Sequence, residues 1–131
     1  MKLFFTIFLI LQTGIVFAGK KPTELDNKVA KNAITCFVGH TVAGSYEPTI
    51  ANRYLAASFI LIGSDKTDKL KNDIEQKIKT LSKKLGTSEK EEGILLVYKF
   101  CPMIYELTAS NTLLGNKIDK FAEKYNKSKK K

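Results

Sequence analysis

The sequence predicts a small all-α domain, a bundle of about five helices held together by one disulfide. Three observations predict this class. Apolar residues recur at intervals of three and four through most of the chain. Glycines and prolines divide the chain into segments of helix length. The one run that suits a strand, LLVY at 95–98, has no second alternating run of comparable quality to pair with.

The first 18 residues predict a secretory signal peptide that is cleaved after Ala18. Lys2 precedes an apolar stretch, residues 3–17, and the segment ends in the V-x-A pattern of a cleavage site. Polar residues interrupt the stretch, and it is shorter than the ~20 residues needed to span a bilayer. An uncleaved anchor is the alternative, favoured by the two lysines at 20–21. We expect export to the periplasm.

The remaining chain has the length of a single domain. We expect one helical domain over 19–125 and a disordered basic tail over 126–131, because NKSKKK is too polar to fold. Loss of Lys2 lowers the net charge from +9 to +8. The lysines are spread along the chain and Arg53 is the only arginine, so the sequence lacks the arginine and aromatic clusters of nucleic-acid-binding proteins.

The first two helices have clear ends. Thr23 is the predicted N-cap of the first, Gly39 weakens its far end, and Gly44 stops it. The second opens at Tyr46-Glu47-Pro48, with the proline in its first turn, and ends at Gly63. It is apolar nearly all round, which is typical of a central helix or an oligomer interface. The predicted inner positions are Leu25, Val29, Ala33, Cys36, Phe37 and His40 in the first helix and Ile50, Tyr54, Ala57 and Leu61 in the second.

The third helix, Ser64 to Leu85, is strongly amphipathic and ends at Gly86. Its lysine-rich face indicates either an ordinary solvated surface or a surface that binds a membrane or a partner. The apolar stripe is Leu70, Ile74, Ile78, Leu81 and Leu85, and the lysines are Lys66, Lys69, Lys71, Lys77, Lys79, Lys83 and Lys84.

The fourth helix begins at a capping box formed by Ser88 and Glu91, and Pro102 should kink or restart it. A break follows over 108–111, and Asn111 or Thr112 caps the last helix. Along the fourth helix, one side carries Ile94, Leu95, Tyr98, Cys101 and Tyr105. The last helix should bury Leu114, Ile118, Phe121 and Tyr125.

Cys36 and Cys101 are the only cysteines. In an oxidising compartment a single pair in a small domain most often forms a disulfide. It would close a loop of about 65 residues and contribute roughly 4 kcal/mol. A free buried thiol pair is an alternative, and a metal site is a weaker one, because His40 is the only histidine.

Catalysis has little support in the sequence. Cys36 and His40 share a helix face, so a thiol–imidazole dyad is conceivable, but a disulfide would consume the thiol. Glu91 and Glu92 lie in the first turn of a helix, where the positive end of the helix dipole stabilises acidic side chains, so they need no catalytic role. We found no phosphate loop, metal-binding motif or nucleophile elbow. The sequence therefore predicts a non-enzymatic protein without cofactor or metal.

Two segments resemble a known family. AITCFVGH at 33–40 is similar to the start of the periplasmic immunity proteins that protect bacteria from type VI secretion amidase effectors. KFCPMIY at 99–105, followed by residues 113–121, is similar to that family's second cysteine segment and closing helix. The lysine-rich region 66–84 and Pro102 depart from the family pattern.

The resemblance implies an all-α fold, often homodimeric, in which Cys36 and Cys101 are joined. It also implies that the protein neutralises a peptidoglycan-cleaving amidase by occupying its active-site groove, through contact residues that the resemblance does not identify. The alternative function is a cationic peripheral protein of the envelope, which binds anionic membrane or cell-wall polymer through its lysines.

Overall fold

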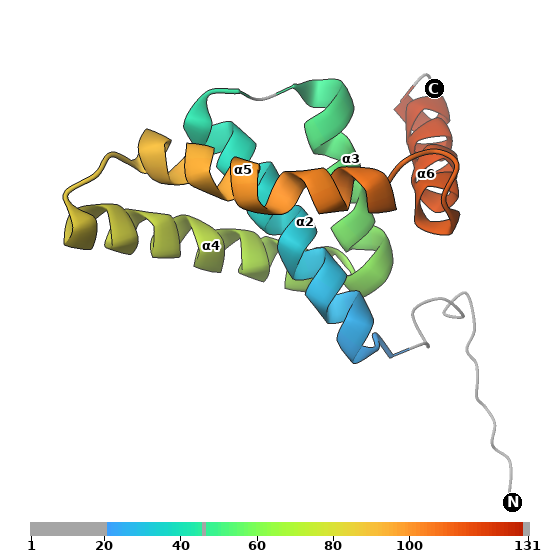
Figure 1. The fold of residues 1–131 in the computed structure, drawn as a ribbon. Helices are drawn as coiled ribbons and strands as arrows, with labels where there is room; N and C mark the ends of the chain where they lie inside the picture. The colour runs from blue at the N-terminus through green and yellow to red at the C-terminus, as the bar shows by residue number, and fades with distance from the viewer. Residues whose placement is uncertain (1–20, 46, 130–131) are drawn as a thin grey trace, which may run out of the picture.

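The computed structural model describes residues 21–45 and 47–129, which form five α-helices and no strand (Figure 1). The all-α prediction is confirmed. The predicted signal peptide, residues 1–18, lies outside the described residues. No helix in the described part combines the length and apolarity needed to cross a membrane. The helices are α2 (Glu24–Ala43), α3 (Pro48–Ile62), α4 (Ser64–Leu85), α5 (Glu89–Leu107) and α6 (Leu113–Lys129).

The helix ends follow the predicted signals. Thr23 and Ser88 each accept a hydrogen bond from the third residue of the helix that follows, in complete capping boxes. Gly44 ends α2 in the left-handed conformation, with φ 75°. Pro102 lies inside α5, which continues to Leu107, so the helix does not restart there.

Helix α2 forms the centre of the bundle. It packs against α3, α4 and α5, and residues 33–39 are all buried. The sequence favoured the 48–62 helix for a central or interfacial position. Helix α3 does contact all the other described helices, yet the most enclosed segment belongs to α2. Small side chains, Ala30 and Ala33 among them, let neighbouring helices approach α2 from several sides.

Two glycines allow α2 and α5 to cross closely. A Cβ on Gly93 would lie 3.0 Å from the carbonyl oxygen of Gly39 and from the backbone nitrogen of Ala43. A Cβ on Gly39 would lie 3.2 Å from Val97 Cγ2. Gly39 was expected to weaken the end of the helix. In the structure, its missing side chain leaves the space in which α5 packs against α2. The close crossing also places Cys36 beside Cys101.

Helix α6 lies at the edge of the bundle and packs mainly against α3 (Figure 1). Phe121 and Tyr125, which were predicted to be buried, are 41% and 52% exposed, because no other described helix covers that side of α6. The helix runs to Lys129, whereas the sequence predicted a disordered tail from Asn126. Side-chain contacts hold this last turn, and residues 130–131 lie outside the described part.

Candidate protein-binding site

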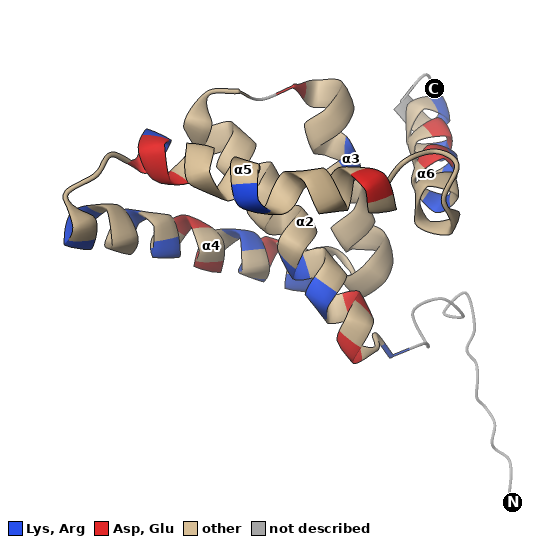
Figure 2. Cartoon of the chain, in the orientation of Figure 1, with Lys and Arg blue, Asp and Glu red and all other residues tan. Residues whose placement is uncertain are grey.

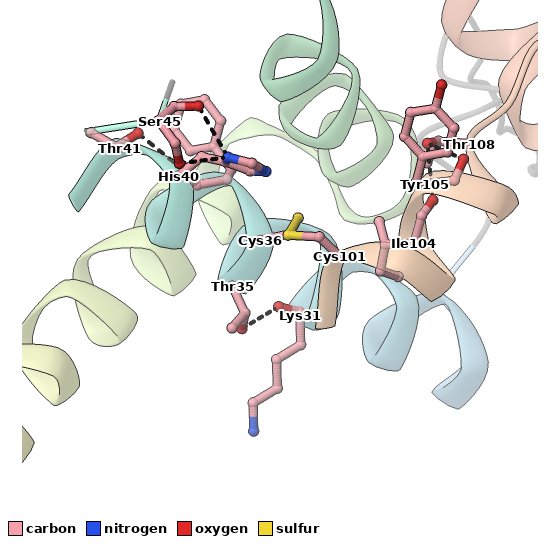
Figure 3. The surroundings of a disulfide bond; sticks show 11 residues. Lys31, Thr35, Cys36, His40, Thr41, Ser45, Cys101, Ile104, Tyr105 and Thr108 are labelled. Atoms are coloured by element: carbon pink, nitrogen blue, oxygen red, sulfur yellow. Dashed lines mark hydrogen bonds between the residues drawn. A yellow bond between two sulfur atoms is a disulfide. The ribbon is translucent and has the colours of Figure 1, made fainter. Parts of the chain in front are cut away.

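The disulfide joins Cys36 of α2 to Cys101 of α5, whose Cα atoms are 5.3 Å apart (Figure 3). Both cysteines are buried, with exposed fractions of 0% and 6%. This pairing confirms the predicted bridge and contradicts the free-thiol alternative. It also removes the nucleophile from the conceived Cys36–His40 dyad, because a bonded sulfur carries no thiolate.

The His40 side chain lies in the last turn of α2 and contacts Ser45, which follows the helix. Its Nδ1 lies 3.2 Å from the carbonyl oxygen and 3.1 Å from the hydroxyl of Ser45 (Figure 3). The imidazole stacks on the ring of Tyr54, with ring centres 6.2 Å apart. Burial, together with the nearby Tyr105 hydroxyl, raises the pKa of Tyr54, so its phenol stays neutral. These contacts give His40 a structural role in the disulfide form.

A run of exposed apolar side chains lies on α5. Tyr98 is 82% exposed and Leu95 is 59% exposed, and Ile94 and Tyr105 are about half exposed. Together with the exposed Pro102, these residues form what we call the α5 stripe.

The predicted face of this helix was therefore only partly right, because Cys101 is buried while the other four members are exposed. Helix α5 is apolar around most of its circumference, so residue spacing alone does not decide which side packs inward. The glycine crossing and the disulfide decide it, and they turn the Gly93–Cys101 side towards α2.

The α5 stripe continues into two recesses. Tyr105 lines a hollow of about 270 Å³ beside the turn that follows α5. Thr49 and Arg53 of α3 line both this hollow and a larger groove of about 640 Å³ between α3 and α6. Phe59, Phe121 and Tyr125 give the groove an aromatic wall. We call the stripe, hollow and groove together the binding face.

Arg53 fixes the shape of the two recesses. One guanidinium nitrogen donates to Asp119 of α6 at 2.6 Å, and the other donates to the carbonyl oxygen of Thr108 at 2.6 Å. The hydrogen bonds from Arg53 and Ser110, together with the positive charge of Arg53, hold the pKa of Asp119 below its usual range. Sequence reasoning noted Arg53 only as the sole arginine. An arginine among so many lysines was a signal, since a guanidinium presents its donors on separate nitrogens of a rigid planar fork, whereas lysine has a single nitrogen.

The lysines of α4 form a separate surface (Figure 2). Six of the seven predicted positions are exposed and Lys71 is intermediate. Acids interrupt the row, and Asp65, Asp73 and Glu75 each precede a lysine by four residues. This spacing is typical of a solvated helix surface with local charge compensation.

The binding face has the composition of a protein interface. Exposed tyrosines and aliphatic side chains supply apolar area, and tyrosine is among the residues that contribute most to interface energy. Comparison with protein-family models, curated proteins and solved structures finds no match for this chain.

Proposed function

We propose that this chain is a periplasmic immunity protein that binds and neutralises a peptidoglycan-cleaving amidase effector of a type VI secretion system. The observation that carries the proposal is the exposed α5 stripe, with Tyr98 projecting from it. The two cysteine segments that resemble the immunity family lie on α2 and α5. The second segment, 99–105, includes Tyr105 of the stripe, and Tyr98 directly precedes it.

The disulfide supports the proposed compartment. Disulfides form and persist in oxidising environments such as the bacterial periplasm. The bridge joins the helix that presents the stripe to the centre of the bundle. A stripe held rigidly in this way loses little conformational entropy when it binds.

The shape of the stripe suits an inhibitor. A ridge of large side chains on a helix is complementary to a cleft, and an amidase must bind its peptide substrate in a cleft. Inserting Tyr98 and Leu95 would exclude the substrate without any chemistry by the inhibitor. We infer steric occlusion as the mechanism.

The test is inhibition of an amidase encoded beside this chain. Leu95→Ala should weaken inhibition by at least about tenfold, as expected for an interface residue that contributes more than about 1.4 kcal/mol. Leu85→Ala is a matched control, because Leu85 on α4 is also 59% exposed but lies outside the binding face. Equal inhibition by both variants would contradict the assignment of the stripe, and failure of the unmodified protein to inhibit would contradict the function.

We also propose that the free protein forms a homodimer through the binding face. Contiguous exposed apolar patches are uncommon on monomers and mark sites of association. A second copy would cover the stripe until an amidase displaces it.

A cationic envelope protein is the second candidate function, and the lysines of α4 are the observation that favours it. Attraction to an anionic surface of about 1 kcal/mol per lysine could accumulate along the helix. Sedimentation with anionic vesicles at low and high salt separates the two functions. Salt-sensitive binding to vesicles, with no effect on an amidase, would favour the envelope function.

A further inference from the structure

We propose that the reduced form of this protein binds Zn²⁺ through Cys36, Cys101 and His40. The two sulfurs and one imidazole nitrogen already lie within 4.8 Å of one another. Two thiolates and an imidazole are a known zinc ligand set, with a fourth position for water. This site goes beyond the proposed function and is independent of it.

The helix backbones bring the three proposed ligand residues close together. Cys36 and His40 are one helical turn apart on α2, so they face the same side. Cys101 reaches them from α5 because the Gly39–Gly93 crossing brings the helices together. Tetrahedral zinc with Zn–S bonds of about 2.3 Å needs its sulfurs about 3.8 Å apart. Rotation of the two side chains, whose Cα atoms are 5.3 Å apart, can provide that separation.

The surroundings of His40 favour the required tautomer. The Ser45 carbonyl can only accept a hydrogen bond, so it favours the proton on Nδ1, 3.2 Å away. Nε2 then keeps its lone pair, and it lies on the opposite side of the ring from Ser45 (Figure 3). A zinc-bound histidine is commonly held in this way, with its other nitrogen donating to a carbonyl.

The charge balance also fits a buried site. A dithiol reductant passes two electrons and two protons to the disulfide, which yields two cysteine thiols and an oxidised dithiol. Zinc binding then releases both thiol protons to solvent. Two thiolates, one Zn²⁺ and a neutral imidazole sum to zero charge, so no unpaired charge is buried beside Cys36. The disulfide and the zinc site use the same sulfurs and exclude each other.

The test is titration of the reduced, purified protein with Co²⁺, a spectroscopic substitute for Zn²⁺. The reduced protein should show thiolate-to-cobalt charge-transfer bands and visible bands of tetrahedral cobalt, and Zn²⁺ should displace the cobalt at one equivalent. The oxidised protein is the matched control and should show neither set of bands. His40→Ala should weaken binding by more than about 100-fold, since loss of an outer-shell partner alone costs 10–100-fold.

Folding is measured in the same samples by far-UV circular dichroism. If reduction lowers the helicity, Zn²⁺ should restore it, because metal binding is coupled to folding. Absence of cobalt bands in folded reduced protein would overturn the proposal. Zinc that fails to restore helicity to unfolded protein, or affinity unchanged in His40→Ala, would also overturn it.

Discussion

The α2–α5 pair and the α3–α6 junction are built in opposite ways. Helices α2 and α5 meet through glycines, buried side chains and a covalent bond. Helix α6 meets α3 through one fully buried apolar side chain, Ile118, and the polar contacts of Arg53, while its aromatic side chains stay half exposed. The backbones of the first pair approach each other closely at Gly39 and Gly93, whereas the second pair leaves a groove of about 640 Å³. The covalent and closely packed contacts are therefore concentrated at the α2–α5 pair, and the groove lies at the α3–α6 junction.

Removal of the disulfide should have the largest effect on stability. Cys36→Ser with Cys101→Ser frees the unfolded chain from a loop closed across 65 residues, which should lower the free energy of unfolding by about 4 kcal/mol. Urea unfolding of the variant and of the oxidised protein measures the difference. A loss below about 1 kcal/mol would show that packing at the glycine crossing suffices.

Gly115→Ala should have the next largest effect, at the α3–α6 junction. A Cβ on Gly115 would lie too close to the carbonyl oxygen of Ala109, so the turn before α6 must shift. We expect a loss of about 2 kcal/mol, typical of overpacking. Hydrogen exchange should become faster in α6 and stay unchanged in α2. Asn116→Ala, at the exposed neighbouring position, is the control and should change neither.

The contact between Arg53 and Asp119 should contribute less and depend on pH. Arg53→Lys keeps the charge but loses the second nitrogen, which donates to the Thr108 carbonyl oxygen. Loss of that hydrogen bond should lower the free energy of unfolding by about 1 kcal/mol. The folded-state pKa of Asp119 is lowered, so its contribution is present above the unfolded pKa of about 3.9 and is lost as pH falls through the folded value. The stability difference from Asp119→Asn should therefore be full above about pH 5 and shrink in more acidic solution. A difference that does not change with pH would contradict this role.

The two regions also differ in how far the sequence predicted them. The fold class, the helix caps at Thr23 and Ser88 and the disulfide followed from local patterns and from cysteine chemistry. The exposed α5 stripe did not follow from such patterns, because α5 is apolar on more sides than the core can cover. Only a long-range contact, the crossing at Gly93, decides which side faces inward.

The groove between α3 and α6 could not be predicted from the sequence, for a related reason. Phe121 and Tyr125 have the spacing of a buried helix face, and spacing does not reveal how many neighbours a helix has. Arg53 joins segments more than fifty residues apart along the chain. No local pattern encodes that contact.

Tyr98→Asp should have the smallest effect on stability and a large effect on association. Tyr98 is 82% exposed, so the substitution should change the free energy of unfolding by less than about 0.5 kcal/mol. In a homodimer formed through the α5 stripe, the carboxylate would be buried without a partner, which strongly disfavours association. Sedimentation equilibrium should show a dimer for the unmodified protein and a monomer for Tyr98→Asp, and Leu85→Asp on α4 should remain dimeric. A monomer in every case would contradict the dimer while leaving the inhibition test intact, and a dimer that tolerates Tyr98→Asp would move the interface away from α5.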